Sequence, residues 1–249
     1  MKHIAIIWFP GTNCEEETLH AVEAAGMSGT IVRWNQKLNN FDGYIIPGGW
    51  SYEDRIRAGA IAAHDIMLEQ IKKEAALGKP VLGICNGCQV ITEAGLVPHN
   101  TSEPEIALAP NKNPFVSGYF CTHTFVKIKK KTAFTLFNEG DILKIPIAHG
   151  EGRFITSDER IKEHIKEYAA VVYCTAEGEE KQEFPINPNG SLHNIAGLTN
   201  DKGNVLALMP HPERCAFDHQ TGARANNGTP GIKIFQSMKR YIENANTLC

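Results

Sequence analysis

Long apolar runs are absent from this sequence. No segment reaches the roughly 18–20 apolar residues that a membrane-spanning helix requires. The opening segment MKHIAIIWFP has a basic residue and a short apolar stretch, as an export signal does. However, Pro10 and Gly11 end it as a strand-to-loop break, without the small residues of a cleavage site. We therefore expect no membrane association and interpret this segment as the first buried strand.

An excess of positive charge is also absent. The 249 residues carry a formal net charge of −3, so the sequence does not indicate a nucleic-acid partner. The one basic run, Lys127 to Lys131, is typical of a solvated strand or hairpin. A disulfide framework is not indicated either, because the seven cysteines are an odd number and no export signal accompanies them. We expect reduced thiols and a cytoplasmic protein.

Two motifs for binding metals and nucleotides are missing. Cys85 and Cys88 form a C-x-x-C pair, but no second pair supplies the other two ligands of a zinc site. The phosphate-binding pattern G-x-x-x-x-G-K-[ST] does not occur. We therefore expect no metal site and no cofactor in this chain, and no ATP site of its own.

Apolar strands alternate with helical segments along most of the chain. We expect strands at Ile4–Phe9, Thr30–Trp34, Gly43–Pro47, Val81–Ile84 and Asn204–Met209. We expect helices from a cap at Asn13 to Gly26, from about Asp54 to Leu77, from Cys85 to about Gly95, and from Gly231 to Ala245. This pattern predicts one α/β domain over residues 1–249, with a mostly parallel central sheet and helices on both faces. The strand-like segments Tyr119–Ile128 and Ile142–Ile147 predict a small antiparallel section.

A cysteine lies in a tight turn between a predicted strand and a predicted helix. The segment is Gly83-Ile84-Cys85-Asn86-Gly87, the nucleophile-elbow pattern with cysteine in place of serine. Its glycines permit a tight, strained turn, and the helix amino terminus favours the thiolate. A buried structural cysteine, or a redox pair with Cys88, remains an alternative on this motif alone.

A histidine and a glutamate follow the last predicted strand, in Met209-Pro210-His211-Pro212-Glu213. His211 is a candidate base for a thiol, and Glu213 is a candidate to orient and charge-stabilise the imidazole. A capping histidine beside a solvated glutamate is the alternative. The elbow cysteine and this histidine together favour the catalytic interpretation.

Two glycine-rich segments also follow strands. In Pro47-Gly48-Gly49-Trp50-Ser51, the Gly49 N–H is a candidate, together with that of Asn86, to hold an oxyanion. An ordinary turn is the alternative. The segment from Ala148 to Phe154 (AHGEGRF) is a dense polar cluster that indicates substrate contact, and its His149 is the chief rival to His211 as base.

These motifs together resemble the class I (triad) glutamine amidotransferases, and among them the glutaminase subunits of phosphoribosylformylglycinamidine synthases. The resemblance spans nearly the whole chain and rests on Phe9–Cys14, Pro47–Tyr52, Arg57–Ala62, Gly83–Gly87, Ala148–Phe154, and Pro188–Ser191 with Met209–Arg214. The sequence departs from that pattern at Glu53, where glycine is expected, at Cys88 in place of phenylalanine, and at Thr122 in place of a basic residue.

The resemblance implies a flavodoxin-like glutaminase fold with Cys85 as nucleophile, His211 as base and Glu213 as orienting acid. It also implies glutamine contacts near Gln89 and in the loop that contains His149, Gly150 and Arg153.

The resemblance also implies partners. Glutamine is the expected substrate, and a separate synthetase subunit is expected to hold ATP and magnesium and to use the ammonia on formylglycinamide ribonucleotide. A small accessory subunit is expected in the same complex. Three alternatives stay open: a glutaminase serving another synthetase, a cysteine hydrolase of the deglycase type, and an inactive regulatory relative.

Overall fold

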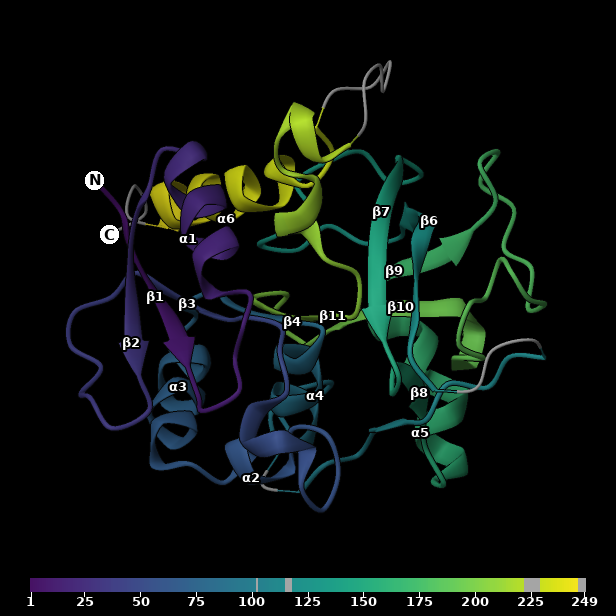
Figure 1. Cartoon of the computed structure of the whole chain (residues 1–249), viewed down its shortest axis with the longest axis horizontal. Helices are drawn as coiled ribbons and strands as arrows, with labels where there is room; N and C mark the ends of the chain where they lie inside the picture. The colour runs from purple at the N-terminus through teal and green to yellow at the C-terminus, as the bar shows by residue number, and fades with distance from the viewer. Residues whose placement is uncertain (102, 115–117, 222–228, 246–249) are drawn as a thin grey trace.

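One large sheet forms the centre of the molecule (Figure 1). The computed structural model describes residues 1–101, 103–114, 118–221 and 229–245. Within these residues, nine strands follow the order β2-β1-β3-β4-β11-β10-β9-β6-β7. They are β1 (His3–Trp8), β2 (Ser28–Arg33), β3 (Gly43–Ile46), β4 (Val81–Ile84), β6 (Phe120–Ile128), β7 (Ile142–His149), β9 (Ala169–Cys174), β10 (Ile195–Thr199) and β11 (Val205–Leu208). A separate antiparallel pair joins β5 (Ala107–Ala109) to β8 (Arg153–Ile155).

The first five strands of this order are parallel to one another. Every residue of β3, β4 and β11 is buried, which explains why these strands are continuously apolar rather than alternating. Helices α1 (Glu15–Ala24) and α6 (Ile232–Ala245) cover one face, and α3 (Ile66–Ala76) and α4 (Asn86–Glu93) cover the other (Figure 1). The predicted parallel sheet with helices on both faces is confirmed.

The remaining four strands, β10, β9, β6 and β7, are antiparallel and continue the same sheet through the pairing of β10 with β11. Strands β6 and β7 were predicted, whereas β9 and β10 were not identified from the sequence. The end of β7 lies beside the parallel half of the sheet, where the Ala148 carbonyl oxygen is 3.5 Å from Sγ of Cys85.

The long helix predicted from Asp54 to Leu77 is wrong. A 3₁₀ turn (Ser51–Asp54), the short helix α2 (Ala60–Ala63) and α3 occupy this region instead. Gly59 breaks the pattern with φ of +78°, and a side chain there would lie 2.7 Å from the Val90 nitrogen in α4. Asp65 then caps α3, because its side chain accepts a hydrogen bond from the Met67 N–H at 2.9 Å.

The cap predicted for the first helix is also wrong. Cys14, not Asn13, occupies the cap position of α1, and no side chain caps this end. Oδ1 of Asn13 instead accepts a hydrogen bond from the Cys14 thiol at 3.2 Å. The helix still ends before Gly26, whose φ of +78° is the left-handed conformation expected there.

The segment from Asp218 to Pro230 is polar and rich in glycine and asparagine, and it lies partly outside the described residues. Its first part, Asp218–Gln220, forms a 3₁₀ turn. Helix α5 (Glu159–His164) follows β8 and lies beside the antiparallel half of the sheet (Figure 1).

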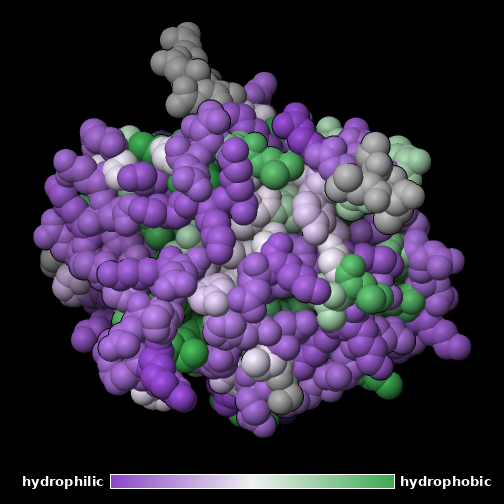
Figure 2. All heavy atoms as spheres, turned by 180° about the vertical axis from the view of Figure 1, so that it is seen from behind, coloured by the Kyte–Doolittle hydropathy of each residue, from purple (hydrophilic) through white to green (hydrophobic). Residues whose placement is uncertain are grey.

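The face seen in Figure 2 is mostly hydrophilic, and its hydrophobic residues form small separate patches. The basic run behaves as an ordinary exposed strand end, because Lys127 and Lys129 lie 3.6 and 2.7 Å from Glu180. Within the described part of the chain, no helix is both long and apolar enough to cross a membrane.

Candidate active site

Cys85 occupies a strained turn between β4 and α4. Its φ of 50° and ψ of −104° lie in a region that residues with side chains rarely adopt. The flanking glycines make the turn possible, because a side chain on Gly83 would collide with the Gly87 carbonyl and one on Gly87 with the Ile46 carbonyl. The elbow predicted from the sequence is therefore confirmed as a structure. Strained backbone of this kind is typical of positions where a side chain must be held in one place.

The thiol of Cys85 is nearly enclosed, with 6% of the residue exposed. It donates a hydrogen bond to the Ala148 carbonyl at 3.5 Å, and its backbone N–H donates to Leu208 at 2.8 Å. Because Cys85 precedes the first turn of α4, the positive end of that helix favours the thiolate.

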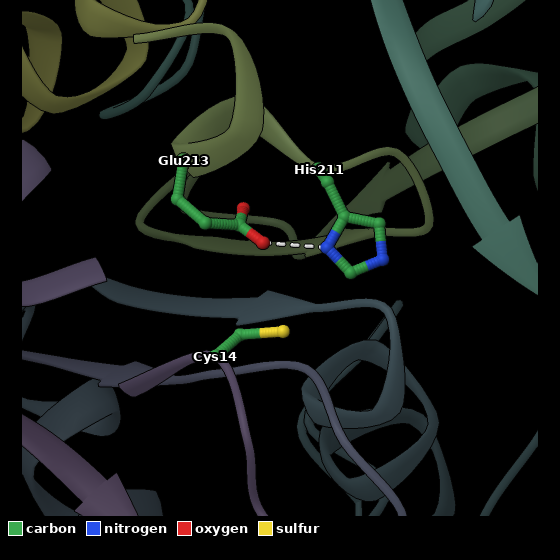
Figure 3. Close-up of side chains that lie close together, drawn as sticks. All are labelled: Cys14, His211 and Glu213. Carbon is green, nitrogen blue, oxygen red and sulfur yellow. Dashed lines mark hydrogen bonds and ion pairs between the residues drawn. The ribbon is translucent and has the colours of Figure 1, made fainter. Parts of the chain in front are cut away.

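His211 and Glu213 form a buried pair beside β11. Nδ1 of His211 lies 2.5 Å from Oε1 of Glu213, and both side chains are almost fully enclosed (Figure 3). Burial by itself lowers the pKa of His211, but the Glu213 carboxylate and then Cys85 raise it well above its ordinary value. The ring nitrogen Nε2 has no hydrogen-bond partner among the described residues, so it is available to exchange a proton with groups in the pocket.

The base and the nucleophile meet at Gly48. A side chain at this position would lie 2.9 Å from Cε1 of His211 and 3.5 Å from Cβ of Cys85. The structure therefore brings Cys85, His211 and Glu213 to one place, as the sequence predicted. In this state the thiol donates to the Ala148 carbonyl, so it must turn away from that carbonyl before its proton can pass to His211.

Cys14 is a further thiol next to this pair. One ligand atom from each of Cys14, His211 and Glu213 lies within 4.8 Å of the others, a spacing that a metal ion spans (Figure 3). Nη2 of Arg214 donates to Sγ of Cys14 at 3.0 Å, which puts positive charge where the cation would lie. We therefore assign no metal to this cluster.

Two backbone N–H groups remain candidates for the oxyanion site. Gly49 has φ of +154°, and a side chain there would lie 2.6 Å from the Gly11 carbonyl. Its N–H forms none of the backbone hydrogen bonds found among the described residues. Asn86 is the first residue of α4, so its N–H has no partner within the helix. Its side chain joins the two segments, because Oδ1 accepts from the Ser51 N–H at 2.9 Å.

A pocket of about 200 Å³ opens above Cys85 and His211. Among the predicted substrate contacts, Gln89, His149 and Gly150 line it. The structure does not bring Arg153 to this pocket; Nε of Arg153 donates to the Pro110 carbonyl at 3.0 Å instead.

The pocket also contains residues that had no assigned role in the sequence. These are Asn13, Cys14, Trp50, Asp54, Tyr119, Ala148, Glu151 and Arg214. Six of them lie inside stretches that carried the resemblance, which was the available signal: Asn13, Cys14, Trp50, Ala148, Glu151 and Arg214. Tyr119 belongs to no sequence motif. It directly precedes β6, and its ring stacks on that of Trp50 with 5.8 Å between the ring centroids.

Comparisons with known proteins agree with this geometry. The phosphoribosylformylglycinamidine synthase subunit PurQ of Methanothrix thermoacetophila is 46% identical, over 96% of this chain and 98% of the relative. The PurQ subunit of Pyrococcus horikoshii is 42% identical, over 98% of this chain and 100% of the relative. The solved structure of PurLQS from Thermotoga maritima matches with a TM-score of 0.78 and 33% identity, over 97% of this chain and 99% of that chain. The CobB/CobQ-like glutamine amidotransferase domain matches residues 1–242, and the chain belongs to this family.

Proposed function

We propose that this chain is the glutaminase subunit of a phosphoribosylformylglycinamidine synthase. The observation that carries the proposal is that the elbow thiol of Cys85 and the imidazole of His211 line one pocket, while the buried Glu213 holds that imidazole from behind. The similarity to PurQ subunits over nearly the full length of both chains supports the assignment to this synthase.

The first half of the reaction forms a thioester. His211 takes the thiol proton, and the Cys85 sulfur forms a bond to the side-chain amide carbon of glutamine. The tetrahedral oxyanion accepts hydrogen bonds from the N–H groups of Gly49 and Asn86. His211 then gives its proton to the leaving nitrogen, so the carbon–nitrogen bond breaks and ammonia leaves.

The second half hydrolyses that thioester. Water attacks the thioester carbon while Nε2 of His211 takes a proton from it. The bond from carbon to the Cys85 sulfur then breaks, glutamate is released, and His211 returns the proton to the sulfur, which restores the thiol. Glu213 holds the imidazole through Nδ1 and stabilises its charged form in both halves.

Ammonia is the product that a partner uses. The synthetase subunit supplies ATP and magnesium and transfers the ammonia to formylglycinamide ribonucleotide, and a small accessory subunit completes the complex. The PurLQS match supports this assembly. The chain itself requires no cofactor, acts in the cytoplasm and forms one glutaminase domain.

Trapping of the thioester cysteine tests the mechanism. The complex with its synthetase partner is treated with a glutamine-analogue electrophile, and the labelled peptide is identified by mass spectrometry. Label is expected on Cys85 and is expected to vanish in Cys85→Ala. Cys88→Ala is the matched control, since it removes a buried thiol one helical turn away and leaves labelling intact.

Two results would contradict the assignment. Labelling that persists in Cys85→Ala would show that Cys85 is not the nucleophile. Ammonia that is consumed on another acceptor, but not on formylglycinamide ribonucleotide, would keep the glutaminase and assign it to a different synthetase.

A further inference from the structure

A second thiol, that of Cys88, shares the first turn of α4 with Cys85, and the reaction proposed above does not use it. Cys85 precedes the helix, and Cys88 is the third residue of the helix. The Gln89 N–H donates to the Cys85 carbonyl at 3.1 Å, so one closed helical turn carries both cysteines. Two cysteines in this spacing, at the start of a helix that follows a parallel strand, are typical of thiol–disulfide redox centres.

The spacing of the two cysteines permits a disulfide after a small movement. Cβ atoms three residues apart on a helix are about 5–6 Å apart, whereas a disulfide requires about 3.5–4.5 Å. The pair must therefore approach by roughly 1–2 Å. The start of a helix permits such a movement, because its first N–H groups have no intrahelical partner to lose.

The two residues between the cysteines are anchored to the rest of the protein. Oδ1 of Asn86 accepts from the Ser51 N–H at 2.9 Å, and Nδ2 of Asn86 donates to Oδ1 of Asp54 at 3.1 Å. Gly87 packs so closely on the Ile46 carbonyl that a side chain there would collide with it. These contacts keep the first turn of α4 formed, so the two cysteines stay neighbours.

The two thiols differ in access, as the members of a redox pair do. Cys85 lines the pocket, so a small oxidant can reach its sulfur. Cys88 is fully buried, and burial, followed by the charge of Cys85, raises the pKa of Cys88 well above its ordinary value. An oxidant therefore reacts first with Cys85, while Cys88 waits beside it as a protonated thiol.

Cys14 is the other thiol near Cys85, but its sulfur already has two partners. It donates to Oδ1 of Asn13 at 3.2 Å and accepts from Nη2 of Arg214 at 3.0 Å. A bond from Cys14 to Cys85 would break both contacts. Cys88 is therefore the better placed of the two thiols to react with an oxidised Cys85.

We propose that Cys88 is the resolving thiol for Cys85, so that a peroxide converts the pair into a disulfide and reversibly inactivates the glutaminase. The inference rests on the function proposed above, because it takes Cys85 as the reactive thiol. A sulfenic acid that is not resolved proceeds to a sulfinic acid, which ordinary thiols do not reduce. The disulfide would protect the nucleophile from that loss.

Two steps form this disulfide. His211 takes the proton of Cys85, and the sulfur attacks one oxygen of hydrogen peroxide. The O–O bond breaks, the departing hydroxide leaves as water with the proton from His211, and the sulfur is oxidised to a sulfenic acid. The sulfur of Cys88 then attacks the sulfur of Cys85. The S–S bond forms, the S–O bond breaks, and the hydroxide leaves as water with the proton of Cys88.

Activity and peptide masses after oxidation test the pair. The reduced complex with the synthetase partner is treated with hydrogen peroxide, and ammonia release from glutamine is measured before treatment, after it, and after added dithiothreitol. We expect a loss of about tenfold or more that dithiothreitol reverses. The unreduced peptide that contains both cysteines should have lost two hydrogens.

Two substitutions remove the resolving thiol. Cys88→Ala leaves a small apolar side chain in the core, and Cys88→Phe introduces the residue that the family pattern has at this position. Each reduced variant should release ammonia at close to the native rate. After peroxide, each should carry a dimedone adduct on Cys85, which marks a sulfenic acid, and prolonged treatment should cause a loss that dithiothreitol does not reverse.

Cys14→Ala is the matched control, because it removes the other thiol near Cys85. Measured against its own reduced activity, this variant should keep the reversible loss and the changed peptide mass.

The outcomes separate this redox pair from the proposed function. A disulfide between Cys85 and Cys14, or a native complex that collects the dimedone adduct and stays inactive in dithiothreitol, would overturn the pair. Variants of Cys88 that recover as fully as the native complex would also overturn it. A reduced native complex that releases no ammonia from glutamine would instead contradict the glutaminase assignment, and the peptide mass would still report on the pair.

Discussion

At the scale of single residues, the Glu213 carboxylate determines the charge state of the neighbouring His211 imidazole. Both His211 and Glu213 are buried, so neither charge is screened by water. Glu213→Gln should lower the pKa of His211, because the carboxylate that raises it is gone. We expect the loss of kcat to be about 100-fold or more.

The pH dependence of kcat provides the measurement for Glu213→Gln. The acid limb reports protonation of His211, which must be neutral to take the thiol proton, so this limb should move to lower pH in the variant. An acid limb that stays in place would show that another residue sets the charge of the imidazole. His149 is a poor replacement, because its pKa of about 3 keeps it neutral over the working range.

The carboxylate of Asp54 is expected to lower the free energy of unfolding at neutral and alkaline pH. Its pKa is about 6 in the folded protein, above the ordinary value of 3.8, so the folded state prefers the protonated form. Protonation of Asp54 stabilises the folded state fully at pH values below the pKa of this group in the unfolded chain. That stabilisation is lost as the pH rises through about 6. Asp54→Asn should therefore be more stable than the native chain at pH 8, by about 1 kcal/mol after solvent screening is considered.

Urea unfolding at pH 4.5 and pH 8 measures this effect of Asp54→Asn. The advantage of the variant should be present at pH 8 and shrink at pH 4.5. A variant that is less stable than the native chain at both values would mean that the Asn86 amide requires the charged carboxylate.

At the scale of elements, the loop after β3 explains one departure from the family pattern. Glu53 stands where glycine is expected, and its φ is 60°. A residue with a side chain costs about 1–2 kcal/mol in this conformation, although glycine loses more entropy on folding. Glu53→Gly should therefore raise the free energy of unfolding by about 0.5–1 kcal/mol.

Arg55→Gly is the matched control for Glu53→Gly in urea unfolding. Arg55 and Glu53 pair with each other at 2.7 Å, so both variants lose the same exposed ion pair. Arg55 has an ordinary φ of −59°, so glycine there should only destabilise. If both variants lose stability to the same extent, strain at Glu53 is not the reason.

Sequence reasoning succeeded for elements whose signals are local. Strand β4 and its elbow follow from an apolar run and two glycines, and the turn is short enough to be read directly. The helix predicted from Asp54 to Leu77 failed because the apolar spacing continued across Gly59 and Asp65, the caps at which the separate helices α2 and α3 begin. Strands β9 and β10 lacked a flanking motif and were not identified.

At the scale of the whole molecule, the pocket lies where the two halves of the sheet meet. Cys85 and His211 follow β4 and β11 of the parallel half, whereas Ala148 and His149 end β7 of the antiparallel half. Trp50 and Tyr119 stack on each other at this pocket and are 46% and 49% exposed. We therefore expect these two exposed apolar side chains to face the synthetase partner.

Ile56, two residues after Asp54, is a further exposed apolar side chain. It is 84% exposed, and its φ of 73° is strained for a branched side chain. Ile56→Asp should leave the fold intact and weaken binding to the synthetase subunit by about tenfold in Kd. Titration calorimetry measures this, with Leu77→Asp as control.

Leu77 is a matched control because it is 79% exposed and lies at the far end of α3. Its substitution should not change Kd. Equal effects of Ile56→Asp and Leu77→Asp would indicate a general loss of solubility or fold rather than a contact at the pocket.

The sequence alone determined the elbow at Cys85 and the pairing of His211 with Glu213, because each depends on residues within a few positions along the chain. Tertiary structure decided what surrounds them. Asp54 follows β3 in the parallel half, whereas His149 ends β7 and Glu151 follows it in the antiparallel half, and only the order of strands in the sheet brings these segments together. Tertiary structure also left Arg153 outside, since β8 pairs with β5 and directs that side chain to Pro110.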